Sequence, residues 1–396
     1  MLTTRASTLL FVLAGLAGAL VLAGCTTHAP SPVTPVGRVF DRLALTATPF
    51  SGSNAVAQLA LADERSCARM VNGTVKCWGM LHDERLQLSP SVIGNVDDVV
   101  DLAVGYDHSC LLEASGVVRC WGMNDHGQLG DGTHNDALFA TGDPGIVGIA
   151  EIAVGERFSC ARALSGAVSC WCRNTHGELA DGTTVYRPSP VLLPSLSGVV
   201  DLALTRGRGV ALDREGRVLL WGSSGDLALT FAAEPLAMAP TSPLDAPPRV
   251  VRIETSLTHS CVLLSDGTVR CWGQNEHGEL GDGTEIDRAT PAPVVGLSHV
   301  VQIAVGRGTS CARLADGTAK CWGNDNYGQL GDGTFTSRSL PVPVSKLVRC
   351  KQIAIAYSHA CALLDDGEVQ CWGSNASGEL GDRTRKDREV RGPVLW

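Results

Sequence analysis

Twelve of the fifteen cysteines form pairs whose members are ten positions apart, and the second cysteine of each pair directly precedes a tryptophan. Two thiols at a fixed spacing can form a disulfide or bind a metal ion. Structural zinc sites usually place about two to four residues between paired cysteines, so the nine intervening residues here disfavour zinc. The pairs are Cys67 with Cys77, Cys110 with Cys120, Cys160 with Cys170, Cys261 with Cys271, Cys311 with Cys321 and Cys361 with Cys371.

The residues between the paired cysteines predict a β-hairpin. Cys311 and Cys321 are equally far from Asp316, the centre of an Asp-Gly turn, so they would face each other across two antiparallel strands. Facing residues in such a pair have Cα atoms about 4.5–5.5 Å apart, which lies within the range of a disulfide. We therefore predict six disulfides, each closing a short loop and each stabilising the fold by roughly 2–3 kcal/mol.

Other side chains that could bind a metal recur in the same pattern. His108, His259 and His359 each lie two positions before a cysteine, but each in a different repeat, so a packing or loop role is predicted. Calcium needs about six to eight oxygen ligands, whereas each Asp-Gly-Thr segment offers one aspartate that can cap its own turn. We expect no metal and no cofactor. Cys172 and Cys350 belong to different repeats, so each is predicted to be a free thiol or an intermolecular link.

The cysteine pattern is part of a unit of about 50 residues that occurs seven times. The fourth unit has Val210 and Leu220 in place of both cysteines, so the two positions change together. A repeat of this length is typical of propellers and solenoids. The units align on their tryptophans, which are Trp78, Trp121, Trp171, Trp221, Trp272, Trp322 and Trp372.

Each unit predicts four strands. In the sixth, residues 301–305 alternate between apolar and other side chains, which indicates a first strand, and the cysteine hairpin supplies two more. A Gly-rich loop follows, and the segment around Pro341 and Pro343 can only be an edge strand. The chain is therefore predicted to be all-β, a seven-bladed β-propeller with four-stranded blades over residues 55–396. Residues 391–396 or a strand near residues 38–45 could supply the outer strand of blade seven.

The motif HSC-[LV]-L-x-x-x-G-x-V-x-C-W-G-x-N-x-x-G-[QE]-L-G-D-G-T resembles the regulator of chromosome condensation repeat family, in its cysteine-bearing bacterial form. The resemblance runs from about residue 55 to the C-terminus, although units one and four lack the GQLGDGT loop. It implies a propeller. It also implies binding of another protein, as in related secreted bacterial propellers, rather than nucleotide exchange on a nuclear GTPase.

The N-terminus predicts export. Arg5 is the only charge in residues 1–24, and an apolar run ends in Leu-Ala-Gly before Cys25, which resembles the bacterial lipobox. We expect residues 1–24 to be a lipoprotein signal peptide, although a plain signal peptide with a chance cysteine is the alternative. Cys25 would carry lipid and residues 25–54, rich in Pro, Ser and Thr, would be a flexible tether. By resemblance, Thr26 indicates the outer membrane.

Charge and cysteine content agree with export. The net charge is −9, and removal of the signal peptide with its single arginine would make it −10. A nucleic-acid partner would favour a basic surface, so none is expected. Fifteen cysteines suit an oxidising compartment better than the cytosol.

Glu254 is the exception on the predicted innermost strand. Either it lines the axial channel in contact with solvent, which is the reading we favour, or it is buried against a partner that offsets the cost. A carboxylate with a perturbed pKa could mark a catalytic site. The aligned positions of the other units hold Ala60, Ala103, Ala153, Ala203, Ala304 and Ala354.

The units differ most after the Asp-Gly-Thr turn, which favours a binding function. We expect a non-enzymatic binding or scaffold protein on the bacterial envelope, with a protein or glycan partner held by these loop tips. The alternative is a propeller hydrolase or lyase that uses a channel carboxylate such as Glu254. The predicted tip residues are Tyr186, Arg187, Asp287, Arg288, Phe335, Arg338 and Arg388.

Overall fold

The structure is a computed structural model, and it describes residues 55–94, 96–222, 232–238 and 248–396. The predicted signal peptide, Cys25 and the whole of the predicted tether lie outside these residues, so those expectations stay predictions. All regular elements in the described ranges are strands. None of the described residues forms a helix long and apolar enough to span a membrane.

The residues in these ranges form twenty-eight strands, which are arranged as seven groups of four. The innermost strands are β1 (Val56–Ala62), β5 (Val99–Val104), β9 (Ile149–Val154), β13 (Val199–Leu204), β17 (Val250–Thr255), β21 (Val300–Gly306) and β25 (Cys350–Ile355). The second strands are β2 (Arg65–Met70), β6 (His108–Glu113), β10 (Phe158–Ala163), β14 (Arg208–Asp213), β18 (His259–Leu264), β22 (Thr309–Leu314) and β26 (His359–Leu364). The third strands are β3 (Val75–Met80), β7 (Val118–Gly122), β11 (Val168–Cys172), β15 (Val218–Gly222), β19 (Val269–Gly273), β23 (Ala319–Gly323) and β27 (Val369–Gly373). The outer strands are β4 (Leu86–Val92), β8 (Ala137–Gly142), β12 (Arg187–Leu192), β16 (Ala232–Met238), β20 (Arg288–Pro293), β24 (Arg338–Pro343) and β28 (Arg388–Pro393).

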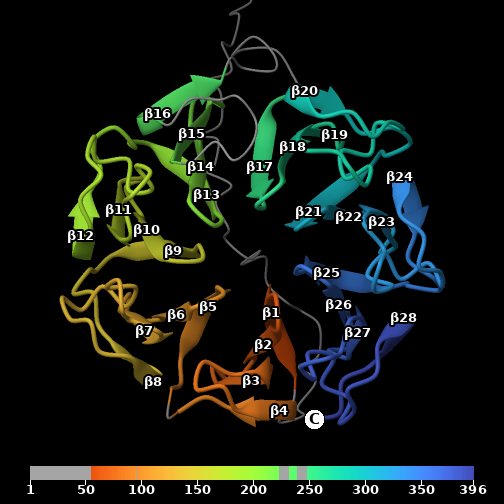
Figure 1. Ribbon diagram of the computed structural model, residues 1–396, viewed down its shortest axis with the longest axis horizontal. Helices are drawn as coiled ribbons and strands as arrows, with labels where there is room; N and C mark the ends of the chain where they lie inside the picture. The colour runs from red at the N-terminus through yellow and green to blue at the C-terminus, as the bar shows by residue number, and fades with distance from the viewer. Residues whose placement is uncertain (1–54, 95, 223–231, 239–247) are drawn as a thin grey trace, which may run out of the picture. The chain divides into compact units, whose positions relative to one another are not determined.

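Each blade is one antiparallel sheet made of four consecutive strands. Figure 1 shows the seven sheets around a common centre, with the innermost strands nearest to it and the outer strands at the rim. This confirms the predicted seven-bladed propeller. Blade seven takes its outer strand, β28, from the C-terminal end of the chain, which is one of the two closures considered. Among the described residues, blades seven and one are therefore held together by non-covalent contacts alone.

Six disulfides join the second and third strands of six blades, which confirms the pairing that the spacing predicts. In each pair the two cysteines face each other in register, as Cys311 and Cys321 do, with Cα atoms 4.1 Å apart, just below the expected range. In blade four Val210 faces Leu220 at the same place. Because such a set of disulfides persists only where thiols are oxidised, it indicates a compartment outside the cytoplasm. The bonds join Cys67 to Cys77, Cys110 to Cys120, Cys160 to Cys170, Cys261 to Cys271, Cys311 to Cys321 and Cys361 to Cys371.

Glutamine side chains on the innermost strands connect neighbouring blades. The Gln352 amide accepts a hydrogen bond from the Leu59 N–H at 2.8 Å and donates one to the Leu59 carbonyl at 2.9 Å. Gln302 does the same for Ile353, at 3.1 and 2.9 Å. The side-chain amide thus pairs with backbone N–H and carbonyl groups at the free edge of an innermost strand, where no neighbouring strand could pair with them. The contact that closes the ring repeats the contact between blades six and seven.

The aligned tryptophans form a second connection between blades. Trp322 Nε1 donates to the carbonyl of Glu279 in the preceding blade, and Trp78 Nε1 donates to that of Glu379 across the closure, both at 2.8 Å. The accepting carbonyls lie in the Gly-rich loops, so these loops are part of the packing between blades. The motif is missing from blade four, and Trp272 in the next blade has a buried Nε1 without an acceptor among the described residues.

A histidine–serine contact is the third connection. His259 Nε2 lies 2.6 Å from Ser310 Oγ, and this hydroxyl donates to the Glu279 carbonyl at 3.1 Å, so it accepts from the imidazole. All three histidines of this kind are fully buried, and burial lowers the pKa of each to about 3. The packing role predicted for them is therefore what the structure shows. The same contact joins His108 to Ser159 at 2.5 Å and His359 to Ser66 at 2.8 Å.

Cys172 and Cys350 do not pair, as predicted, and both are buried thiols. Burial keeps them from an intermolecular disulfide while the blades are folded. Cys172 has φ 93°, in the left-handed region, at the position where every other blade has glycine. At the matching Gly323, an added Cβ would lie 2.3 Å from the Gly308 carbonyl. Blade three therefore carries backbone strain at this point, where Cys172 Sγ donates to the His126 carbonyl at 3.1 Å.

A candidate binding face around a central pocket

Antiparallel pairing places two sets of loops at the same end of every blade. In blade five, His259 at the start of β18 faces Gly273 at the end of β19, which in turn faces Arg288 at the start of β20. The turn after the innermost strand and the loop before the outer strand therefore lie together. The cysteine-hairpin turns and the connections between blades lie at the other end.

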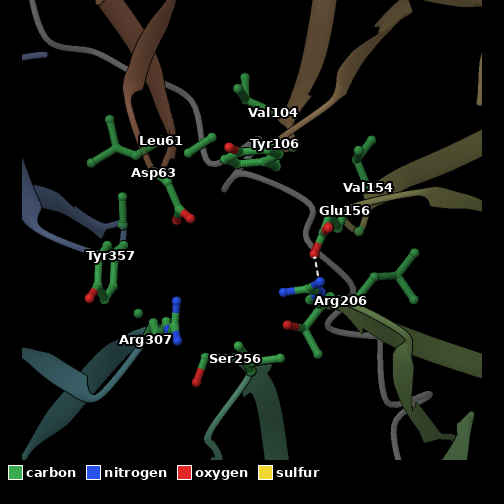
Figure 2. A pocket seen from close by; sticks show the side chains of 18 of the residues that line it. Leu61, Asp63, Val104, Tyr106, Val154, Glu156, Arg206, Ser256, Arg307 and Tyr357 are labelled. Atoms are coloured by element: carbon green, nitrogen blue, oxygen red, sulfur yellow. Dashed lines mark ion pairs between the residues drawn. The ribbon is translucent and has the colours of Figure 1, made fainter. Parts of the chain in front are cut away.

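A pocket of about 490 Å³ lies at the centre of the ring, where the innermost strands end (Figure 2). All seven blades line it with the last residues of these strands and the turns that follow them. Its volume is in the range of sites that hold a small molecule. We call the end of the propeller that carries this pocket and the two sets of loops the pocket face, and the other end the opposite face.

Three charged residues on one side of the pocket, Glu156, Arg157 and Arg206, form ion pairs with one another and with Asp107, which is not a lining residue. Arg206 Nε lies 2.8 Å from Glu156 Oε2, an ion pair drawn in Figure 2. Arg157 Nε lies 3.7 Å from Glu156 Oε1 and 3.0 Å from Asp107 Oδ2. Burial raises the pKa of both carboxyl groups, and the arginines oppose this shift. This side of the pocket therefore has little net charge to offer a ligand.

Two further charged groups line the pocket without an ion pair to any described residue. Burial raises the pKa of the Asp63 carboxyl, and the positive charge of Arg307 opposes this shift, so the two groups lie within electrostatic reach. The Arg307 guanidinium lies 4.9 Å from the centre of the Tyr357 ring, in a cation–π contact. Figure 2 shows Asp63, Tyr357 and Arg307 grouped on one side of the pocket, and Glu156 and Arg206 on the other.

All four tyrosines of the chain lie on the pocket face. Tyr106 and Tyr357 line the pocket. Tyr327 lies in the Gly-rich loop of blade six, with its ring 6.3 Å from that of Tyr357. Tyr186 lies at the loop tip of blade three, where it is 40% exposed. Tyrosine is enriched where proteins contact partners, so its confinement to one face distinguishes that face.

The Gly-rich loops are held rigidly by their own side chains. Asn275 Nδ2 donates to the carbonyls of Thr284 and Ile286, and its Oδ1 accepts from the Leu280 N–H at 2.9 Å. Asp282 Oδ1 accepts from the N–H and the hydroxyl of Thr284 at 2.9 and 2.7 Å. The aspartate thus caps its own turn, as predicted. The described residues contain no cluster of three or more His, Cys, Asp or Glu side chains suited to a metal ion.

The predicted tip residues divide into two groups. Asp287 accepts a hydrogen bond from the Asn275 N–H at 2.8 Å, so its carboxylate holds its own loop. Tyr186 and Phe335 are 40% and 55% exposed, which makes them the tip residues best placed to touch a partner. The four arginines each pair with an aspartate of their own loop, namely Arg187 with Asp181 at 3.2 Å, Arg288 with Asp282 at 3.0 Å, Arg338 with Asp332 at 3.0 Å and Arg388 with Asp382 at 2.6 Å.

Glu254 is half-buried on β17, opposite Cys261, and is not among the residues that line the pocket. Its predicted place in the axial channel stays a prediction. The carboxylates at the pocket are Asp63 and Glu156, which the repeat comparison did not single out. The sequence feature that could have indicated them is one aligned position in the turn after each innermost strand. The residue at this position varies in type and charge between units. Those residues are Asp63, Tyr106, Glu156, Arg206, Leu257, Arg307 and Tyr357.

Comparison with known proteins identifies the repeat. Two models described as regulator of chromosome condensation (RCC1) repeat match, one at residues 99–128, 250–279, 300–329 and 350–379 and the other at 266–313 and 316–363. The crystal structure of Prp20p from Saccharomyces cerevisiae is 21% identical, with a TM-score of 0.70 over 82% of this chain and 86% of that one. Human WBSCR16 is 20% identical, with a TM-score of 0.69 over 79% and 87%. These structural likenesses concern the fold, and the family models show that several repeats of this chain are regulator of chromosome condensation (RCC1) repeats.

Proposed function

We propose that this protein is a non-enzymatic binding or scaffold protein that engages a protein partner through its pocket face. The observation that carries the proposal is the gathering of all four tyrosines on that face, around a pocket with charged side chains. Tyrosine and arginine are the residues that most often dominate the energy of protein interfaces. The solved structure of Prp20p is described together with its binding to Gsp1p and histones, which supports a protein partner more than a glycan.

We further propose that the protein acts on the bacterial envelope. The six disulfides support export, and the lipobox-like segment before Cys25 supports lipid attachment at the outer membrane. Mass spectrometry of the mature N-terminus tests this proposal. A lipidated Cys25 as the first residue is expected, whereas an unprocessed Met1 would contradict it.

A propeller hydrolase or lyase is the second candidate, and the geometry favours it less. Glu254 does not line the pocket, and Glu156 is already paired with Arg206 and Arg157. Asp63 is the remaining pocket carboxylate, and an acid–base mechanism would ask for a second group positioned beside it. A rigid surface with exposed aromatic rings suits recognition better than it suits proton transfer.

Site-specific crosslinking tests the binding proposal. A photoreactive phenylalanine analogue would replace Tyr186 or Phe335 on the pocket face, and Val71 or Leu164 as matched exposed positions on hairpin turns of the opposite face. We expect crosslinks to one protein from the first pair only. Alanine at Tyr186 or Phe335 should then weaken that complex by about tenfold or more if the ring is an anchor. Equal crosslinking from both faces, or crosslinks from Val71 and Leu164 alone, would refute the proposal.

A further inference from the structure

The pocket contains two charges of opposite sign that no described residue pairs. Asp63 belongs to blade one and Arg307 to blade six, and Tyr357 of blade seven lies between them around the ring. No salt bridge joins the two groups to each other or to another described residue, and the only partner of the Arg307 guanidinium among these residues is the Tyr357 ring, 4.9 Å away. Asp63 is half-buried. A charge in that position is stabilised when a ligand group of opposite charge binds beside it.

The rest of the pocket does not compete for such a ligand. Glu156, Arg157, Arg206 and Asp107 are joined to one another by ion pairs of 2.8 to 3.7 Å. A ligand that used any of these groups would have to break an existing pair. The lining next to Asp63 and Arg307 includes Tyr357, the hydroxyl-bearing Ser256, and apolar or backbone groups such as Ala62 and Gly306. Among the described lining residues, Asp63 and Arg307 are therefore the charges that a ligand can reach without breaking an ion pair.

A ligand with one charge would satisfy one of the two groups and be repelled by the other. A ligand that carries both charges can satisfy both groups at once. Arginine binds carboxylates through two parallel hydrogen bonds, and an aspartate accepts hydrogen bonds from an ammonium group. The α-amino-acid group carries this pair of charges on one carbon atom. Tyrosine rings beside it can cover an apolar or aromatic side chain.

We propose that the central pocket is a binding site for an α-amino-acid group, with the carboxylate on Arg307, the ammonium on Asp63 and the side chain against Tyr357 and Tyr106. The group belongs to a free amino acid or to the end of a larger molecule that keeps both charges. The inference rests on the proposed function in one respect only, that this face binds. It names a chemical class for the centre of the face, whereas the loop tips contact the protein partner.

Calorimetry and saturation-transfer NMR on the purified mature protein test the site. The probes are L-phenylalanine, L-leucine and Nε-acetyl-L-lysine, the last of which mimics an amino-acid end on a larger molecule. N-acetyl-L-phenylalanine and L-phenylalaninamide each lack one charge. We expect at least one zwitterionic probe to bind. The affinity of each blocked form of phenylalanine should be lower than that of L-phenylalanine by at least about tenfold. If none of the zwitterions binds at about 10 mM, or if the blocked forms bind equally well, the proposal is wrong.

Two variants assign the charges. Arg307→Gln should bind L-phenylalanine and its amide with the same reduced affinity, and Asp63→Asn should bind L-phenylalanine and its N-acetyl form with the same reduced affinity. Matched controls are Arg214→Gln and Asp97→Asn, exposed charges on the opposite face, which should bind like the wild type. Unchanged midpoints of urea unfolding show that each variant folds. Wild-type affinity in folded Asp63→Asn or Arg307→Gln would overturn the assignment.

The two proposals fail separately. Crosslinking at Tyr186 without amino-acid binding would remove the pocket site and leave the protein-binding face. Amino-acid binding without crosslinking on the pocket face would leave the pocket site and remove the protein partner.

Discussion

Acid should destabilise this propeller through the three histidines buried between its blades. His108, His259 and His359 are fully buried, and burial lowers the pKa of each to about 3, against about 6.5 in an unfolded chain. Between these two values the unfolded state binds a proton that the folded state does not. Stability contributed by the neutral imidazole is therefore fully present above about pH 6.5 and is lost as the pH falls toward 3.

The size of the loss follows from the width of this window. Each pH unit below the unfolded pKa costs about 1.4 kcal/mol per histidine. From pH 7.5 to pH 4.5, one histidine therefore lowers the free energy of unfolding by about 3 kcal/mol, and three lower it by roughly 8 kcal/mol. That sum is comparable to the whole stability of many domains. The propeller is expected to unfold at mildly acidic pH with its disulfides intact.

The assay compares His259→Asn with the wild type. Urea unfolding is followed by tryptophan fluorescence at pH 7.5 and 4.5. The variant loses the contact to Ser310 at both pH values, so it is less stable at pH 7.5, but the difference between the two pH values should shrink by about 3 kcal/mol. His134→Asn, at an exposed loop position, is the matched control and should keep the wild-type difference. An equal pH dependence in His259→Asn and the wild type would refute the reasoning.

Three further predictions concern the repeat itself and use the free energy of urea unfolding at pH 7.5. Gly323→Ala should cost more than about 2 kcal/mol because its Cβ would meet a backbone carbonyl. Cys172→Gly, at the same position of blade three, should be tolerated. Equal losses of unfolding free energy in the two variants would show that the backbone strain is unimportant. Trp322→Phe should cost about 1–3 kcal/mol because it leaves the buried Glu279 carbonyl with one hydrogen-bond donor fewer. Trp272→Phe should cost less, since the N–H that it removes is buried and has no described acceptor. A larger loss in Trp272→Phe than in Trp322→Phe would contradict the role given to the Gly-rich loop. Gln352→Ala should cost about 2 kcal/mol, since both Leu59 peptide groups lose their partner at the ring closure; no loss would mean that this contact does not hold the closure.

Much of the fold could be predicted because its information is local and repeated. Each cysteine pair lies in one hairpin, so the turn between Cys311 and Cys321 is enough to place them opposite each other. The four strands of a blade are consecutive in the sequence, and alternation, turns and prolines mark them one by one. The capped Asp-Gly-Thr turn could be predicted for the same reason, since its hydrogen bonds join residues two positions apart.

The candidate site was harder to predict because its residues meet only after the ring has closed. The sequence predicts that the arginines of the loop tips bind a partner, yet each pairs with an aspartate of its own loop, as Arg288 does with Asp282. Glu254 differs from its aligned alanines, yet it does not line the pocket. An unusual residue in one repeat shows that its surroundings differ, but it does not show which way the side chain points.

The sequence by itself determined the repeat, the blade and the disulfides, since these depend on contacts within about 50 residues. Only the tertiary structure decided that Asp63 and Arg307 share a pocket and that neither has a charged partner there among the described residues. These two residues come from blades one and six, near opposite ends of the propeller sequence. They are brought together when blade seven packs on blade one, through contacts such as Gln352 with Leu59. Ring closure brings the variable residues after the innermost strands together around one centre. No local sequence pattern predicts which of these residues become neighbours.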